Sequence, residues 1–524
     1  MISYRAKYEY VISDGTRLFT AILLPSESGK YPTVVIRRPY VDALETFTEE
    51  EICLRYMTEY ASWLERGYAI VHQHCRGRGK SDGDCIPYIN ERKDSLCLYD
   101  WIRAQSFYNG ELFLRGGSYL SSVHYCAAPY ADDIKGAIFA RQDTDRYNVC
   151  YRNGFLKKGL HGHWYVGMYK AKTMKKKSYT PATFNLLPLS DFTKTVFGES
   201  VESFDDMLKA PKRTDAFWST HNGGVHAGKC LEGLRFPALI TTSQYDIYTG
   251  GVFDMWNSLE EDVRNNCALL VSAYDHSDKH DPVNSITFPK GKRSDGFGEN
   301  YEIDWFDHIR FGTKAPIEKG KVTYYELFSN VWRTDCFETS GETLDFTLGQ
   351  KAVNYTYNPY DAPTFKGGLS CNFGGSVFQD KPNSRHDIIS VYTAPFESDT
   401  RVKGKMSARL TVKSDCPDTC FYVRVSIETE RGDFGLRDDI TSLVYQLGDY
   451  TPNTEVTLDF NFDEHAFVIR KGARLRIDIA SADNEHYVRH TNNRGLFSEQ
   501  TTARVARNTV YLDRSTLTIP VEAN

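Results

Sequence analysis

The fold of this chain follows from one stretch of sequence, Leu112-Phe113-Leu114-Arg115-Gly116-Gly117-Ser118-Tyr119-Leu120-Ser121-Ser122. An apolar run typical of a buried strand meets two glycines, a serine follows, and small and apolar residues then indicate the start of a helix. A sharp turn from strand to helix places a serine hydroxyl above the end of a sheet, beside the N–H groups of the helix. The simpler interpretation is an ordinary Gly-Ser turn, so the rest of the chain must decide between the two.

Strands and helices alternate on the N-terminal side of this stretch. Residues 8–24 predict a hairpin, and apolar strands are expected at 33–37 and 68–73. Between and after these strands, helical spacing predicts one helix from Glu50 to Arg66 and another from Asp94 to Gln105. This alternation indicates a parallel sheet with right-handed crossovers, which is an α/β fold.

The pattern changes twice further along the chain. Residues 141–228 contain no convincing strand but many His, Trp, Tyr and Lys residues, and they predict a mostly helical insertion. Apolar strands return at 237–242 and 267–271. From about residue 320 apolar and polar residues alternate, for example over 406–412, which predicts a jelly-roll-like β-sandwich.

The composition is that of an ordinary globular protein, with 41% hydrophobic and 25% charged residues in 524 positions. Lys and Arg total 63 against 69 Asp and Glu, so the basic excess of a nucleic-acid binder is absent. No apolar run approaches the roughly 18 residues that span a membrane, and the N-terminus lacks the pattern of a signal peptide. The 12 cysteines are therefore expected to be reduced thiols, and we predict a cytoplasmic protein.

Three residues stand where successive strands are expected to end: Ser118, Asp246 and His276. In an open parallel sheet, reactive groups gather beyond the carboxyl ends of the strands. A serine hydroxyl needs a base to become a nucleophile, and the base needs a carboxylate to fix its tautomer. Each residue alone has a simpler explanation as a turn or loop residue, but their order along the chain is that of α/β-hydrolases. The sequence therefore predicts a Ser-His-Asp triad.

Several motifs in this chain resemble those of one family. Residues 116–121 resemble the G-x-S-Y-x-G nucleophile motif of the cocaine esterase and X-Pro dipeptidyl-peptidase (CocE/NonD) family, with Ser121 in place of the last glycine. Arg38-Pro39-Tyr40 is similar to the family's N-P-Y segment, and Tyr245-Asp246 and Tyr274-Asp275-His276-Ser277 are similar to its acid and base segments. Further similar landmarks follow in the family's order, so that the resemblance covers nearly the whole chain: residues 76–83, Trp305-Phe306-Asp307, Gly367-Gly368, Arg385-His386-Asp387 and residues 471–476.

The resemblance implies an α/β-hydrolase fold with a helical cap insertion and a C-terminal jelly-roll-like β-sandwich. The hydrolase domain would occupy residues 1–140 and 229–320, the cap residues 141–228, and the sandwich residues 321–524. No cofactor and no metal are implied. His161, His163 and His280 are the candidates for a metal site, but no third carboxylate or cysteine stands at helical spacing from them.

The resemblance also implies a role for each site residue. Ser118 would attack a carbonyl, His276 would take its proton, and Asp246 would orient His276. The Tyr40 hydroxyl and the backbone N–H of Tyr119 would hold the oxyanion, since a phenol with its usual pKa of about 10 keeps its proton at neutral pH. Aromatic residues of the cap are candidates for lining the acyl pocket, with packing between helices as the alternative: Trp164, Tyr165, Phe217 and Trp218.

The predicted function is hydrolysis of a carboxylic ester through an acyl-enzyme. The alternatives on the same scaffold are an X-Pro dipeptidyl-peptidase, an amidase or an acyltransferase. An inactive carbohydrate-binding protein is the alternative from another class, because the β-sandwich half resembles sugar-binding domains. The expected partner is a small ester or a short peptide or amide, with neither nucleic acid nor membrane, and a homodimer is possible.

Overall fold

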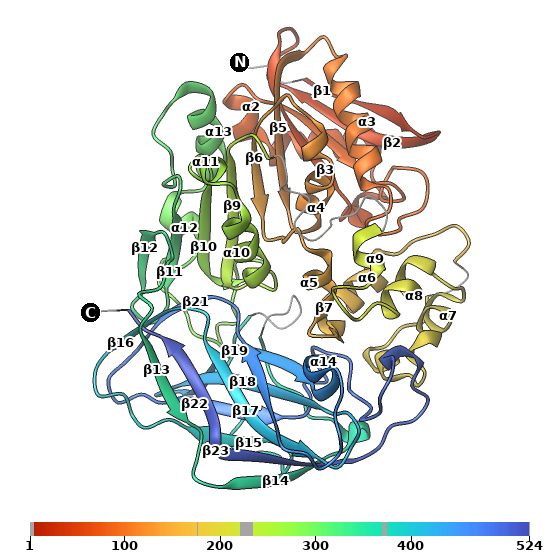
Figure 1. Ribbon diagram of the computed structural model, residues 1–524. Coiled ribbons are helices and arrows are strands. Elements are labelled where there is room, and N and C mark those ends of the chain that lie inside the picture. Colours follow the sequence, from red (N-terminus) through yellow and green to blue (C-terminus); the bar gives the residue numbers. More distant parts are fainter. Residues whose placement is uncertain (1–4, 175–176, 221–233, 369–374, 523–524) are drawn as a thin grey trace.

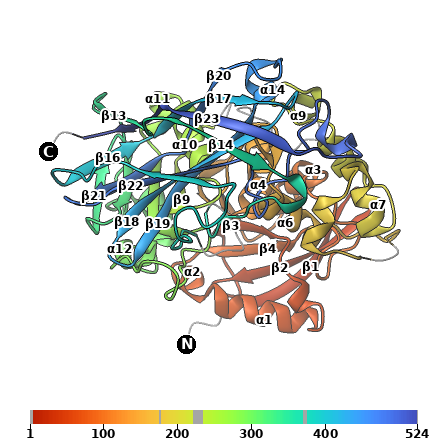
Figure 2. The same ribbon diagram turned by 90° about the horizontal axis from the view of Figure 1, so that it is seen from below.

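The computed structural model describes residues 5–174, 177–220, 234–368 and 375–522. An α/β domain forms the upper half of the molecule in Figure 1, a β-sandwich forms the lower half, and a helical cap (yellow) lies at the right. Seen from below in Figure 2, the cap helix α7 (Phe192–Phe197) and helix α12 (Arg293–Phe297) lie at opposite sides of the molecule.

A ten-stranded sheet forms the centre of the α/β domain, in the order β1-β2-β4-β3-β5-β6-β9-β10-β11-β12. Neighbours from β4 to β11 pair in parallel, whereas the pairs β1–β2, β2–β4 and β11–β12 are antiparallel. The strands are β1 (Arg5–Ser13), β2 (Thr16–Leu24), β3 (Tyr31–Arg38), β4 (Ala69–His74), β5 (Tyr108–Gly117), β6 (Ile134–Ala140), β9 (Ala238–Tyr245), β10 (Ala268–Asp275), β11 (Val322–Glu326) and β12 (Val331–Asp335).

Helices cover both faces of this sheet, because successive strand residues point to opposite sides. Val35 and Leu114 belong to the core on the face of α3 and α4, while Val34 and Phe113 belong to the core shared with α1, α2 and α13. These three layers confirm the predicted α/β-hydrolase fold. The helices of the domain are α1 (Glu49–Glu59), α2 (Ala61–Glu65), α3 (Glu91–Arg103), α4 (Tyr119–Tyr125), α10 (Thr249–Ser258), α11 (Glu261–Arg264), α12 and α13 (Tyr301–Phe311).

The prediction of a single helix from Glu50 to Arg66 is wrong, because the structure has two helices there. The backbone leaves the helical region at Tyr60 (φ −108°, ψ 20°), which ends α1 and begins α2. The break lets the second helix turn Trp63 and Leu64 into the core, where both are buried.

The cap is mostly helical, as predicted, but it also contains a short hairpin that the sequence analysis missed. Strands β7 (Tyr151–Arg152) and β8 (Phe155–Leu156) pair across Asn153 and Gly154, which both have positive φ. Asn-Gly favours this type of two-residue turn. The predicted boundary between residues 228 and 229 lies outside the described residues. The α-helices of the cap are α5 (Arg146–Cys150), α6 (His163–Met168), α7, α8 (Glu202–Leu208) and α9 (Ala216–Thr220).

The C-terminal half is a β-sandwich, as predicted. One sheet has the order β13-β23-β17-β20 with β14 also on β23, and the other has the order β15-β22-β18-β19. The central sheet of the α/β domain runs on to Asp335, beyond the boundary predicted at residue 320. The elements of this half are β13 (Thr343–Thr347), β14 (Ala352–Tyr357), β15 (Ile389–Tyr392), β16 (Thr400–Gly404), β17 (Ser407–Ser414), β18 (Cys420–Thr429), β19 (Gly432–Ser442), α14 (Leu443–Leu447), β20 (Val456–Asn461), β21 (His465–Ile469), β22 (Leu475–Ala480) and β23 (Ala506–Pro520).

Candidate active site

Ser118 lies on a tight turn between β5 and α4. Its backbone is left-handed in φ (φ 58°, ψ −134°), a conformation that non-glycine residues rarely adopt, and its N–H donates to the Ala140 carbonyl at 2.7 Å. A Cβ on Gly116 would lie only 2.2 Å from the carbonyl oxygen of Leu120, so this position requires glycine. The turn therefore has the geometry of a nucleophile elbow.

Ser121 replaces a glycine of the nucleophile motif, and its side chain fastens the turn. The Ser121 hydroxyl is buried and donates to the Gly116 carbonyl at 2.9 Å. It also accepts a hydrogen bond from the Ala140 N–H at 3.2 Å, which ties the elbow to the end of β6. The substitution leaves the elbow intact because a small hydroxyl finds partners on both sides.

Asp246 and His276 stand just beyond the carboxyl ends of β9 and β10. The His276 Nδ1 lies 2.9 Å from Asp246 Oδ1, and the aspartate also accepts hydrogen bonds from the Thr242 hydroxyl and the Tyr248 N–H. Burial alone would raise the pKa of Asp246, but the His276 ring and the Arg141 guanidinium outweigh it, so the pKa lies below its usual value. Asp246 is thus an anion that fixes the orientation of His276.

Ser118 and His276 line one cavity of about 440 Å³, together with Tyr40 and Trp164. Tyr40 follows β3 and is 39% exposed. Its hydroxyl accepts a hydrogen bond from the Trp164 indole N–H at 3.0 Å. The cap therefore reaches the cavity at Trp164 and contacts the tyrosine that the sequence analysis selected as an oxyanion donor.

Tyr119 follows Ser118, and its side chain lies in a buried polar network. Its hydroxyl donates to Glu91 Oε1 at 3.0 Å and accepts from the Tyr88 N–H at 2.7 Å. Glu91 in turn accepts from the Arg37 guanidinium at 2.8 Å. The network fixes the first turn of α4, and with it the backbone N–H of Tyr119.

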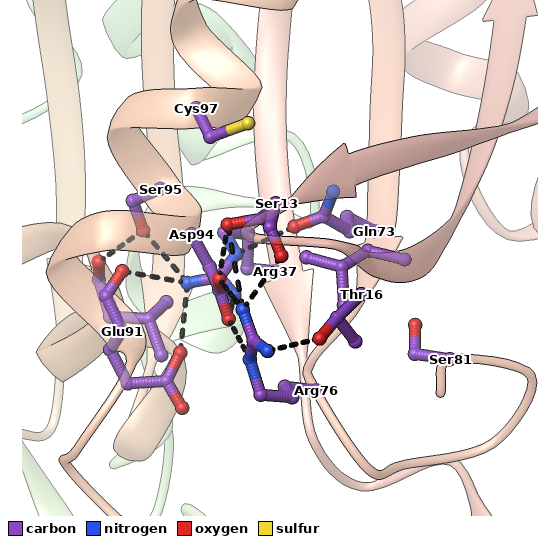
Figure 3. Close-up of polar contacts among 12 residues, drawn as sticks. Ser13, Thr16, Arg37, Gln73, Arg76, Ser81, Glu91, Asp94, Ser95 and Cys97 are labelled. Carbon is purple, nitrogen blue, oxygen red and sulfur yellow. Dashed lines mark hydrogen bonds and ion pairs between the residues drawn. The ribbon is translucent and has the colours of Figure 1, made fainter. Parts of the chain in front are cut away.

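The same network extends to a second carboxylate (Figure 3). Asp94 accepts two hydrogen bonds from the Arg76 guanidinium, at 2.6 and 3.1 Å, and one from the Ser13 hydroxyl at 2.6 Å. Arg37 Nη2 lies 3.6 Å from Asp94. Two cations and two carboxylates thus compensate each other in the buried network that ends at Tyr119, next to Ser118.

Of the four aromatic cap residues, the structure places Trp164 in the described lining of the cavity. Tyr165 is wrong as a lining residue: it is fully buried in the cap core, where its hydroxyl lies 2.7 Å from the Ser203 hydroxyl. Phe217 and Trp218 lie on α9, where Trp218 is buried against Tyr147 and donates its indole N–H to a carbonyl. Packing inside the cap explains these three residues.

The lining also contains charged residues that the sequence analysis did not assign to the site: Arg38, Glu59, Arg115, Arg141 and Glu302. Arg141 could have been found from its position directly after the apolar strand β6, since the carboxyl ends of parallel strands carry site residues.

The histidines considered for a metal site do not form one in the described part of the chain, where no group of three metal-ligating side chains occurs. His161 is buried among aromatic rings, His163 contacts the Tyr179 hydroxyl, and His280 contacts the Thr287 hydroxyl. Within the described residues, every helix is too short or too polar to cross a membrane.

The fold and the elbow define the class of protein, which is a serine hydrolase of the α/β-hydrolase fold. Residues 14–278 match the model of the X-Pro dipeptidyl-peptidase (S15) family, and residues 320–516 match the model of the X-Pro dipeptidyl-peptidase C-terminal non-catalytic domain. The chain belongs to this family.

Individual proteins are similar to this chain in sequence or in fold. Cocaine esterase from Rhodococcus sp. (strain MB1 Bresler) is 23% identical over 553 residues, which cover 93% of this chain and 92% of the esterase. An aminopeptidase from a marine sediment Thaumarchaeota archaeon has a similar fold, with a TM-score of 0.78 at 18% identity over 100% of this chain and 97% of the other. An α-amino acid ester hydrolase also gives a TM-score of 0.78, at 17% identity over 99% of this chain and 97% of the other.

Proposed function

We propose that this chain cleaves a carboxylic ester through an acyl-enzyme formed on Ser118. The observation that carries the proposal is the hydrogen bond of 2.9 Å between Asp246 and His276 at the rim of the cavity that holds Ser118 on its strained turn. An orienting carboxylate, a base and a nucleophile on an elbow are the parts that acyl transfer requires.

In this mechanism Ser118 attacks the carbonyl carbon while His276 takes the hydroxyl proton and later returns it to the leaving group. Asp246 holds the imidazole and stabilises the imidazolium. The Tyr40 hydroxyl and the Tyr119 backbone N–H donate to the oxyanion. In the described part of the chain no hydrogen bond joins Ser118 to His276, and we expect this contact to form when substrate binds.

The charges in the cavity favour an ester or amide over an X-Pro peptide as substrate. A dipeptidyl-peptidase must bind a free α-ammonium group with a carboxylate. The two carboxylates of the described lining are already occupied: Glu59 lies 3.2 Å from Arg38, and Glu302 lies 2.7 Å from Arg115. Freeing either one would leave a cation without its partner.

A fluorophosphonate probe tests the proposal against an inactive binding protein. We expect the wild type to be labelled and Ser118→Ala to remain unlabelled. Ser122→Ala is the matched control, since this buried serine one turn along has a hydroxyl without a hydrogen-bond partner in the described structure. Absence of labelling in folded wild type would refute the proposal. A panel of aryl esters, aliphatic esters and X-Pro anilides then separates esterase from peptidase.

A further inference from the structure

The cavity beside Ser118 has one arginine that forms no close ion pair with a carboxylate of the described chain. Its described lining contains three arginines and two glutamates. Arg38 pairs with Glu59, and Arg115 pairs with Glu302. Arg141 forms no ion pair within 4 Å with any described residue, although its guanidinium keeps its charge at all ordinary pH values.

Arg141 lies between the backbone of His276 and Gly117, the residue before Ser118. Its Nη1 donates to the His276 carbonyl at 2.8 Å. Its Nη2 lies 3.1 Å from where a Cβ on Gly117 would stand, so the glycine before the nucleophile leaves room for the guanidinium. The group is thus fixed at the wall of the cavity rather than free to turn into solvent.

The protein satisfies this guanidinium only in part. The Nε of Arg141 is buried without a hydrogen-bond partner in the described structure. The residue also has a left-handed backbone (φ 55°), which costs free energy for a non-glycine residue and is typical of functional positions. Burial and the nearby positive charge of Arg293 lower the pKa of Arg141, as expected for a cation whose compensation is incomplete.

We propose that Arg141 binds a carboxylate of the substrate, so that the enzyme prefers esters or amides that carry a negative charge. A guanidinium presents a planar set of donors that matches a carboxylate, and such charge-assisted hydrogen bonds are stronger than neutral ones. Arg38 and Arg115 are poor candidates for this role because a substrate would have to displace their glutamates. The inference rests on the proposed function and extends it to a class of substrate.

Matched ester pairs test the inference. In the first pair the acyl group carries the charge: the mono-4-nitrophenyl ester of glutaric acid against 4-nitrophenyl pentanoate, which has the same chain length. In the second pair the leaving group carries it: 3-acetoxybenzoate against 3-acetoxybenzamide. The measured quantity is the ratio of kcat/KM for the charged ester to that for the neutral one, after subtraction of the enzyme-free rate.

We expect the wild type to prefer the charged ester in at least one pair, and Arg141→Gln to lower that ratio about tenfold or more. Arg141→Lys keeps the charge but loses the planar guanidinium, so its ratio should lie between those of Arg141→Gln and the wild type. Arg38→Gln is the matched control, because it removes one positive charge from the same cavity at a paired position, and its ratio should change much less.

Three results would overturn the inference: no preference in either pair, an equal loss on charged and neutral esters in Arg141→Gln, or an equal change of the ratio in Arg38→Gln. The second result would mean that Arg141 only holds the loop of His276 in place. The third would mean that any positive charge in the cavity has the same effect on the ratio. In all three the wild type still hydrolyses neutral esters and reacts with the fluorophosphonate, so the proposed function stands. Failure of the proposed function would instead appear as loss of both activities.

Discussion

Arg37 and Arg38 are neighbours in β3, yet their surroundings are opposite. Arg37 is fully buried on the face covered by α3 and α4, where it donates to Gln73 and Glu91 (Figure 3). Arg38 points to the other face, into the cavity, where its side chain is 33% exposed and pairs with Glu59. A strand alternates its side chains, so one residue step separates the closed network from the open cavity.

The difference shows what each kind of charge can do. The closed network ends on Tyr119, beside the proposed nucleophile Ser118. Its cations and carboxylates compensate one another, so it fixes geometry. The cavity keeps its charges within reach of a ligand and includes Arg141, which forms no ion pair within 4 Å in the described chain. Rigid support and binding are thus divided between the two faces of one sheet.

The strongest test of this division compares Arg37→Leu with Arg38→Leu. Removing Arg37 leaves the buried Glu91 carboxylate without its cation, while Asp94 keeps Arg76, and the loss should cost about 3–5 kcal/mol of unfolding free energy. Removing Arg38 breaks a partly exposed pair and should cost about 1 kcal/mol or less. Urea unfolding of both variants measures the two costs. Equal destabilisation would show that the two faces do not differ as described.

On the cavity face, Tyr40→Phe removes one proposed oxyanion donor without removing the ring. Loss of such a donor typically costs about 2.7–4 kcal/mol of transition-state stabilisation, so kcat should fall about a hundredfold or more. Folding should change little, because Tyr40 is 39% exposed. Steady-state hydrolysis of a 4-nitrophenyl ester measures the effect, with urea unfolding as the control. Full activity in this variant would exclude Tyr40 from the oxyanion site.

Much of the fold follows from local sequence. Short apolar runs predict the strands that end just before Ser118 and near Asp246 and His276, and parallel strands bring their carboxyl ends to one edge. The structure duly places Asp246 and His276 in contact. The hairpin at Asn153-Gly154 was also predictable from its turn residues, but strands of two residues are too short to show a period.

Other features depend on tertiary contacts that no local pattern contains. Alternation shows that Arg37 and Arg38 face opposite sides, but not which side holds the cavity. Trp164 and Tyr165 are adjacent aromatic residues, and only the packing of the cap sends one to the cavity and the other to the core. Arg141 differs from Arg38 and Arg115 in lacking a close glutamate among the described residues, and this difference can be found only from the structure.

The smallest expected effect concerns the hydrogen bond from the cap residue Trp164 to Tyr40, the proposed oxyanion donor. Trp164→Phe keeps an aromatic ring against Tyr88 and Tyr119, whose centroids lie 5.7 and 5.0 Å from that of Trp164, but removes the N–H that donates to Tyr40. Because a phenol that accepts a hydrogen bond becomes a better donor, the loss should lower kcat about three- to tenfold, or roughly 0.5–1.5 kcal/mol, with little change in KM. In the Tyr40→Phe background the same substitution should have no further effect on kcat, since the hydroxyl through which it acts is gone. Independent, additive losses in the double variant would instead show that Trp164 contacts the substrate itself.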